Sequence, residues 1–223
     1  MHVLLFGATG MIGQGVLREC LRDPGVERVV TVGRSATGVT NTKLRQIVHS
    51  ELGNFAPIEA LLVGFDACFF CLGVTSAGMS EADYTRVTYD LTMAAAGVLV
   101  RLNPGMTFVF VSGAGTDSTE RGRLMWARIK GKTENALLRL PFKAAYMFRP
   151  GVVQPLHGVR SRTAAYRVLY SMTAPLLPLL RRLFPNQILT TEEMGLAMLA
   201  AVRRGAPTRV LESRDIRQLA ASG

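Results

Sequence analysis

The sequence has few cysteines and no long hydrophobic run. Three cysteines among 223 residues are too few for a disulfide scaffold. The opening "MHVLLFGATG" shows no basic leader with a cleavage site, so we expect no signal peptide and a cytoplasmic location in which thiols stay reduced. The most apolar segment, Tyr170–Leu180, is too short to cross a bilayer and contains Pro175 and Pro178. We therefore predict no integral membrane segment.

Two of the three cysteines, Cys68 and Cys71, form a C-x-x-C pair that suggests a metal or redox site. They lie within "FDACFFCLG", an apolar run bounded by turn residues that is typical of a buried strand. Residues three apart in a strand point to opposite faces, so the pair is poorly placed for a shared metal or a disulfide. We predict two buried core thiols and no metal site.

Acidic residues are scarce relative to basic ones, with 16 Asp and Glu against 26 Lys and Arg and a net charge of +10. The basic residues of the C-terminal half are scattered, few aromatic residues lie among them, and no nucleic-acid-binding module is recognisable. We interpret them as a solvated basic surface that also attracts an anionic cofactor, and we predict no nucleic-acid partner.

Apolar strand-like runs alternate with amphipathic helical runs along the whole chain. This alternation predicts a single α/β domain over residues 1–223, with a parallel sheet and helices on both faces. One long helix is predicted from a Ser80 N-cap to Leu102, and another carries Trp126 and Lys130. From about residue 155 to 223 the pattern changes, with helical stretches near 164–184 and 191–204 and a strand near 208–211. We interpret this segment as a small helical cap on the substrate side.

A glycine-rich turn follows the first predicted strand. In "GATGMIGQG", Gly7, Gly10 and Gly13 stand between that strand and the first helix. Glycine there allows a tight turn, a close approach of the backbone to a pyrophosphate and close packing of helix on strand, while the helix N-terminus offers free N–H groups. The turn predicts a dinucleotide site.

The end of the second predicted strand indicates which dinucleotide binds. An Asp or Glu there would bond the ribose hydroxyls of NAD. The sequence "VTVGRS" instead has Arg34 and Ser35, and a guanidinium pairs with a 2′-phosphate that an acid would repel. We therefore predict NADP(H) as the cofactor.

These segments together resemble the short-chain dehydrogenase/reductase superfamily, and within it the atypical, epimerase-like members related to the Tat-interacting-protein oxidoreductase group. The resemblance reaches from the start of the chain to about residue 155. It implies a Rossmann-like doubly wound parallel sheet, an oxidoreductase or epimerase-like activity on a small-molecule substrate, and, since many members are dimers or tetramers, a homo-oligomer. The segments that carry it are "GATGMIGQG", "TVGRS", "FFCLGVTSAGMSEADYTRVTYDLT", "FVFVSGAG", "WARIKGKTE" and "YMFRPGVV".

The resemblance also implies the roles of individual residues. Ser112 would take the catalytic serine position, and Lys130 would bind the nicotinamide ribose. Leu52 or Glu51 would line the adenine pocket. The residues expected to contact the cofactor are Gly7, Thr9, Gly10, Met11, Ile12, Gly13, Arg34, Ser35, Leu72, Gly73, Val74, Ser112, Lys130, Pro150, Gly151, Val152 and Val153.

Trp126 departs from the family pattern. The residue four before the lysine is normally a tyrosine, whose hydroxyl passes a proton while hydride moves. An indole N–H donates one hydrogen bond, has no acceptor and does not ionise in the useful range. Trp126 therefore removes the usual proton relay and leaves cofactor binding untouched, and two roles stay open for the indole: to polarise an oxyanion in catalysis or to form a wall of the pocket.

Other groups are available to move the proton. The candidates are His157, Tyr166, Thr75 and Ser76, and Lys130 acting through Ser112 or water. Two functions stay open: an NADP(H)-dependent enzyme acting on a small, apolar carbonyl or alcohol, and a catalytically silent NADP(H)-binding regulatory or interaction protein. A weaker third is peripheral membrane association through residues 176–184.

Overall fold

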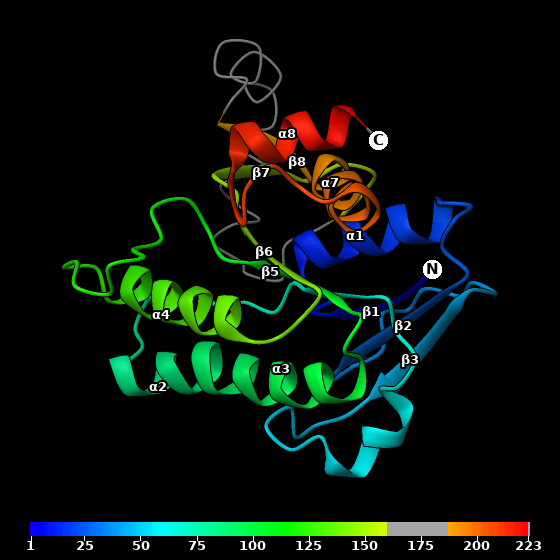
Figure 1. The fold of residues 1–223 in the computed structure, drawn as a ribbon, viewed down its shortest axis with the longest axis horizontal. Helices are drawn as coiled ribbons and strands as arrows, with labels where there is room; N and C mark the ends of the chain where they lie inside the picture. The colour runs from blue at the N-terminus through cyan, green and yellow to red at the C-terminus, as the bar shows by residue number, and fades with distance from the viewer. Residues whose placement is uncertain (160–186, 223) are drawn as a thin grey trace.

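A seven-stranded parallel sheet forms the centre of the molecule (Figure 1). The computed structural model describes residues 1–159 and 187–222. Every pair of neighbouring strands is parallel, which confirms the predicted α/β class. The strands are β1 (His2–Phe6), β2 (Arg28–Gly33), β3 (Leu44–Val48), β4 (Ala67–Phe70), β5 (Thr107–Val111), β6 (Ala144–Arg149) and β9 (Val210–Glu212).

The order of the strands places the site. They run β3-β2-β1-β4-β5-β6-β9, so the chain leaves β1 toward one edge of the sheet and later returns to β1's other side with β4. In doubly wound sheets the crevice at the carboxyl ends of the strands, at this reversal, is where ligands bind. Gly7, after β1, and Cys71, after β4, lie on its two sides.

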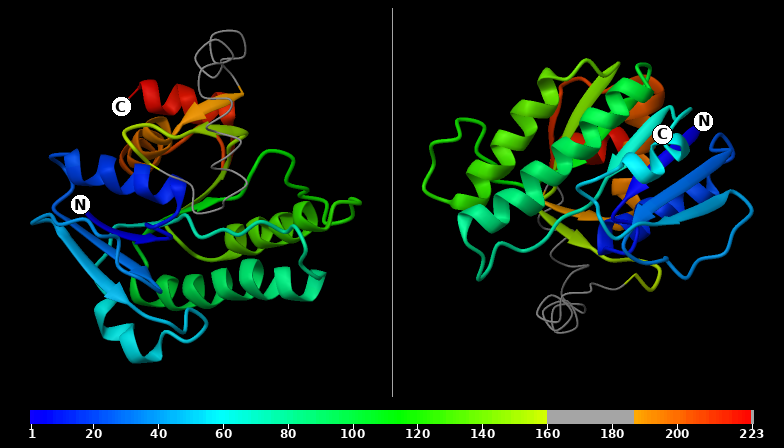
Figure 2. Two further views of the ribbon diagram at one scale, coloured as in Figure 1. Left: turned by 180° about the vertical axis from the view of Figure 1, so that it is seen from behind. Right: turned by 90° about the horizontal axis from the view of Figure 1, so that it is seen from below.

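Helices cover both faces of the sheet, as predicted. One face carries α1 (Met11–Arg22), α7 (Thr191–Arg204) and α8 (Ser213–Ala221), and the other carries α3 (Leu91–Leu102) and α4 (Met125–Arg139), which run side by side in Figure 2. Alternate strand residues serve the two cores: Val3 packs toward α1, and Leu4 packs toward α3. Both side chains are fully buried, and each such burial stabilises the fold by about 1.5–3 kcal/mol.

The long helix predicted between residues 80 and 102 is present with one irregularity. Ser80 is its N-cap and accepts a hydrogen bond from the main-chain N–H of Asp83 at 3.1 Å. The helix begins as α2 (Glu81–Thr85), passes through a π-helical turn, η2 (Arg86–Asp90), and continues as α3. The helix ends where predicted, at Leu102, before Asn103.

The C-terminal segment differs from the predicted cap. Within residues 187–222, β9 joins the main sheet beside β6, and α7 packs closely on α1: a Cβ at Gly15 would lie 2.6 Å from the carbonyl oxygen of Thr191. This part of the expected cap therefore belongs to the core. The sequence pattern of a helix shows that one of its faces is apolar, but it does not show which surface packs against that face. The prediction failed there for this reason. The helix expected near 164–184, and Tyr166, lie outside the described residues.

Three smaller elements complete the fold. A 3-10 helix, η1 (Ala56–Leu61), precedes β4, and β7 (Val152–Gln154) pairs in parallel with β8 (Ile188–Thr190) in a separate two-stranded sheet. Among residues 1–159 and 187–222, no helix is both long and apolar enough to span a bilayer.

The two strand cysteines lie on opposite faces of the sheet, as their spacing predicts. Cys68 is fully buried in the core on the α3 side, and Cys71 packs against the core on the α1 side. Burial raises the pKa of both thiols well above the usual range, so neither is a reactive thiolate.

Candidate functional site

The glycine turn between β1 and α1 has room for glycine alone at two positions. Gly7 has a φ of +77°, and a Cβ there would lie 2.6 Å from the carbonyl carbon of Cys71. A Cβ at Gly13 would lie 2.1 Å from the carbonyl oxygen of Gly7. Gly10 donates its N–H to that same oxygen at 2.9 Å. The three glycines thus bring β1, β4 and α1 together at the reversal of strand order.

The N-terminus of α1 faces this turn with its backbone groups uncapped. Its N-cap residue, Gly10, makes no side-chain cap, and the first turn, which contains Met11 and Ile12, carries no acid. The unsatisfied N–H groups and the positive end of the helix dipole favour an anion at this point. The observed geometry fits a dinucleotide pyrophosphate.

A cavity opens beside the turn and extends to the end of β2. Five of the predicted cofactor residues line it, and Leu52, not Glu51, contributes to its wall. Arg34 is exposed at its rim and makes no hydrogen bond or ion pair with any residue of 1–159 or 187–222. Its guanidinium is therefore available to a ligand. The lining residues are Gly7, Ala8, Thr9, Thr31, Val32, Gly33, Arg34, Ser35, Thr37, Leu52 and Leu72.

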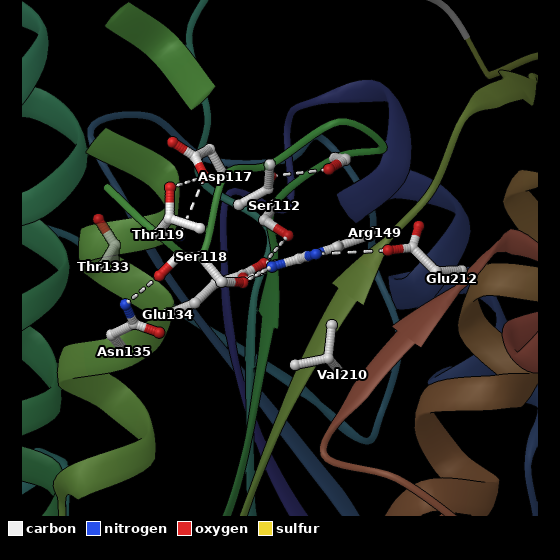
Figure 3. Close-up of polar contacts among 12 residues, drawn as sticks. Ser112, Asp117, Ser118, Thr119, Thr133, Glu134, Asn135, Arg149, Val210 and Glu212 are labelled. Carbon is white, nitrogen blue, oxygen red and sulfur yellow. Dashed lines mark hydrogen bonds and ion pairs between the residues drawn. The ribbon is translucent and has the colours of Figure 1, made fainter. Parts of the chain in front are cut away.

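Ser112 directly follows β5, where the resemblance places a catalytic serine, but its hydroxyl is engaged elsewhere. It donates to Glu134 Oε1 on α4 at 2.5 Å (Figure 3). Both side chains are buried, at 6% and 1% exposure. The Phe148 carbonyl oxygen is a second acceptor at 3.2 Å, and the single hydroxyl proton of Ser112 goes to the closer one, the buried carboxylate.

The next residue faces the lysine instead. A Cβ at Gly113 would lie 3.9 Å from Lys130 Nζ, the nearest atom it would meet. A serine at position 113 would therefore bring a hydroxyl close to Lys130, and the chain has glycine there.

Lys130 belongs to α4, and its side chain reaches the end of β5. Its Nζ donates a hydrogen bond to the carbonyl oxygen of Ser112. Burial lowers the pKa of Lys130 to about 8, although the negative charge of Glu134 acts in the opposite direction. Near neutral pH this amine is therefore able both to hold and to release a proton.

Trp126 stands one helical turn before Lys130 on α4. Its ring lies against Gly115, where a Cβ would be 3.5 Å from the indole edge. The side chain is half-buried, and its N–H makes no hydrogen bond with the described residues. The indole thus lies against the loop that follows β5.

A buried ion pair that the sequence did not reveal stands behind these residues. Arg149, the last residue of β6, donates from Nη2 to Glu134 Oε2 at 2.5 Å and from Nε to Oε1 at 3.0 Å. The same guanidinium donates to Ser118 Oγ at 2.5 Å and approaches Glu212 at 3.4 Å (Figure 3). The one signal in the sequence is that Glu134 lies four residues after Lys130, on the same face of a helix.

The remaining predicted residues lie around this edge. Gly73 and Val74 are exposed after β4. The strand ends β5 and β6 are joined where the Ala114 N–H bonds the Pro150 carbonyl oxygen at 2.9 Å. Gly151 donates its N–H to Ser213 Oγ at 2.8 Å, and Val152 and Val153 begin β7.

Two of the alternative proton donors have partners of their own. His157 pairs with Glu192 of α7 at 2.6 Å, on the α1 side of the sheet. Thr75 is exposed, and its hydroxyl oxygen accepts from the Ala77 N–H. Ser76 is partly buried in the same loop, and Lys130 is the candidate that contacts Ser112.

Sequence comparisons relate the chain to fungal proteins. No protein-family model matches it. It is 28% identical over 165 residues to "Protein fmp52, mitochondrial" of Emericella nidulans, covering 68% of this chain and 66% of that protein. It is 30% identical over 158 residues to "Protein fmp52-1, mitochondrial" of Aspergillus oryzae, covering 68% and 66%. The chain thus spans just under two thirds of the length of these relatives.

Solved structures of low sequence identity have the same architecture. The Bordetella bronchiseptica enzyme WbmF, in complex with NAD+, matches with a TM-score of 0.67 at 15% identity, over 99% of this chain and 76% of that one. DesIV, a dTDP-glucose 4,6-dehydratase of Streptomyces venezuelae with NAD and TYD bound, matches at 0.69 and 16%, over 100% and 80%. A short-chain dehydrogenase/reductase family oxidoreductase of Burkholderia thailandensis matches at 0.68 and 17%, over 99% and 92%.

The strand order, the glycine turn and the adjoining cavity define a Rossmann-type domain. More narrowly, it shares its fold with a short-chain dehydrogenase/reductase family oxidoreductase and with a dTDP-glucose 4,6-dehydratase, which confirms the resemblance at the level of the fold.

The predicted cytoplasmic location is contradicted by the comparisons. The fungal relatives are named as mitochondrial proteins. The prediction depended on the lack of a recognisable leader in the first residues and on few cysteines, and neither feature separates one reducing compartment from another.

Proposed function

We propose that this protein is an NADP(H)-dependent oxidoreductase of the short-chain dehydrogenase/reductase type, acting on a small, apolar carbonyl or alcohol. The observation that carries the proposal is the cavity between the glycine turn and Arg34. Gly7, Gly13 and the N-terminus of α1 would hold the pyrophosphate, and Arg34 would pair with the 2′-phosphate.

The chemistry divides between cofactor and protein. A bound nicotinamide would supply or accept the hydride. Lys130 would hold the proton that the substrate oxygen gains or loses, because its pKa of about 8 allows both protonation states near neutral pH. Ser112 would position Lys130 through its carbonyl oxygen, and Trp126 would wall the substrate pocket.

Calorimetric titration with NADPH and NADH tests the cofactor. We expect NADPH to bind more tightly than NADH, and Arg34→Gln to weaken NADPH binding by about tenfold, the loss of one charge-assisted pair, with little effect on NADH. Arg45→Gln, which removes an exposed arginine of the next strand, is the matched control and should leave both affinities unchanged. Tighter binding of NADH by the wild-type protein would refute the assignment to NADP(H).

A catalytically silent NADP(H)-binding protein is the second candidate. The commitment of the Ser112 hydroxyl to Glu134, together with Trp126, favours it. Oxidation of NADPH with a panel of small apolar aldehydes and ketones separates the two: turnover that is lost in Lys130→Met supports the enzyme. If NADPH binds but no substrate consumes it, and Trp126→Tyr with Gly113→Ser creates activity, the silent protein is the better description.

A further inference from the structure

A buried carboxylate next to Lys130 is not paired with it. Glu134 stands one turn after Lys130 on α4, the spacing at which a lysine and a glutamate commonly form an ion pair. Yet no ion pair joins these two side chains, and Lys130 donates to the carbonyl oxygen of Ser112 instead. Something else must satisfy the carboxylate.

Arg149 and Ser112 occupy both oxygens of Glu134. Oε1 accepts from the Ser112 hydroxyl at 2.5 Å and from Arg149 Nε at 3.0 Å. Oε2 accepts from Arg149 Nη2 at 2.5 Å and from Nε at 3.2 Å. A fork of this kind is the strongest and most directional pairing that a carboxylate makes.

The pair is buried and held from several elements. Glu134 is 1% exposed and the Arg149 side chain 12%. Arg149 comes from β6 and also contacts Ser118, in the loop after β5, and Glu212, at the end of β9. The guanidinium is therefore fixed by contacts independent of α4. The Glu134 side chain cannot rotate toward Lys130 without breaking its pair with Arg149.

We propose that the Glu134–Arg149 pair is a positioning device for Lys130: by engaging the carboxylate, Arg149 keeps Lys130 unpaired and directed to the end of β5, where a proton is to be exchanged. This inference rests on the proposed role of Lys130 as the proton donor. Glu134 and Arg149 act through Lys130 and Ser112 and are not themselves catalytic residues.

The two members of the pair are expected to have opposite effects on Lys130. Glu134→Gln removes the one carboxylate beside Lys130 and retains an oxygen for Ser112, so protonation of Lys130 becomes less favourable. Arg149→Met frees the carboxylate to attract the ammonium, so protonation becomes more favourable. Opposite shifts therefore distinguish a pair that acts on the charge of Lys130 from one that serves in packing alone.

NMR titration of the lysine Nζ and Cε resonances measures this effect. The chain contains only four lysines, Lys43, Lys130, Lys132 and Lys143, so labelled lysine gives a spectrum that Lys→Arg variants can assign. Relative to wild type, we expect the Lys130 midpoint to fall by roughly one pH unit in Glu134→Gln and to rise by roughly one in Arg149→Met.

Controls keep the test decisive. Glu212→Gln removes the more exposed carboxylate that contacts Arg149 and should leave the Lys130 midpoint unchanged. If Arg149→Met does not fold, Arg149→Lys retains the charge without the fork, and a smaller rise is expected. The proposal is overturned if either variant leaves the midpoint in place or moves it in the other direction. Because the titration uses protein without cofactor, failure to bind NADPH in calorimetry counts against the proposed function alone.

Discussion

At the scale of single residues, the departure from the family pattern extends beyond Trp126. Ser112 has the residue type expected after β5, but its hydroxyl is turned to Glu134, and the position that faces Lys130 is Gly113. The tyrosine hydroxyl of the usual relay is thus replaced by an indole, and the serine hydroxyl donates to Glu134. Lys130 has a pKa of about 8 and is not ion-paired with Glu134, which is why the proposed chemistry depends on it.

The low pKa of Lys130 has a consequence for stability. The pKa falls from an unfolded value of 10.5 to about 8, so between these pH values the unfolded chain binds more protons than the folded one. Stability therefore rises with pH across this window, and burial of the charged amine costs stability below it.

Lys130→Met should reveal this cost. We expect the free energy of unfolding of the variant to exceed that of the wild type by the largest amount below pH 8. The difference should decrease by up to about 3 kcal/mol between pH 8 and pH 10.5. Urea unfolding at several pH values measures it, with Lys143→Met as the control. A difference that stays constant over this range would show that the amine is not buried in the charged state.

At the scale of elements, α4 is held against the loop that follows β5. A Cβ at Gly131 would lie 1.8 Å from the carbonyl oxygen of Asp117, so the loop can approach the helix only at a glycine. Asn135, one turn later, donates to the Ser118 carbonyl oxygen at 2.9 Å. This close approach explains why residue 131, next to Lys130, is a glycine.

Alanine at two helical glycines should have opposite effects on stability. Gly131→Ala should destabilise the protein by about 1–3 kcal/mol, because the backbone of the loop must shift. Gly97→Ala in α3, where a Cβ would meet nothing within 4 Å, should stabilise it by about 0.5–1 kcal/mol through helix propensity. Thermal or urea unfolding compares the two. Equal effects would mean that the loop does not contact α4 in solution.

At the scale of the whole molecule, the C-terminal residues complete the domain. Leu211 in β9 and Ile216 in α8 are fully buried in the core on the α1 side, and α7 lies between α1 and α8. A cap could be removed from a domain without unfolding it, whereas a strand of the main sheet cannot.

Truncation distinguishes these alternatives. Removal of residues 206–223 deletes β9 and α8, exposes the edge of β6 and uncovers the apolar face of α7, so we expect loss of cooperative thermal unfolding. Removal of residues 222–223 alone should change stability by only a few tenths of a kcal/mol, as surface changes usually do. If the longer truncation still unfolds cooperatively near the wild-type temperature, these elements are peripheral to the core.

Much of the fold followed from the sequence alone. The strands, the long helix with its Ser80 cap, the opposite faces of Cys68 and Cys71 and the glycine turn all depend on contacts between near neighbours in the chain or on the period of the structure, so they can be recognised locally. Arg34, just after β2, can also be recognised locally, since its position follows from the strand before it.

The tertiary structure alone decided how the site is assembled. The Ser112 hydroxyl meets Glu134 22 residues away, and Arg149 reaches Glu134 across 15 residues and Glu212 across 63. No local pattern encodes such contacts, because they depend on which helix packs on which strand and on how far each side chain extends. The sequence by itself determined two features: a dinucleotide-type turn after the first strand, and a lysine on a later helix. Packing determined that this lysine bonds the Ser112 carbonyl oxygen and lies beside a carboxylate that Arg149 already holds.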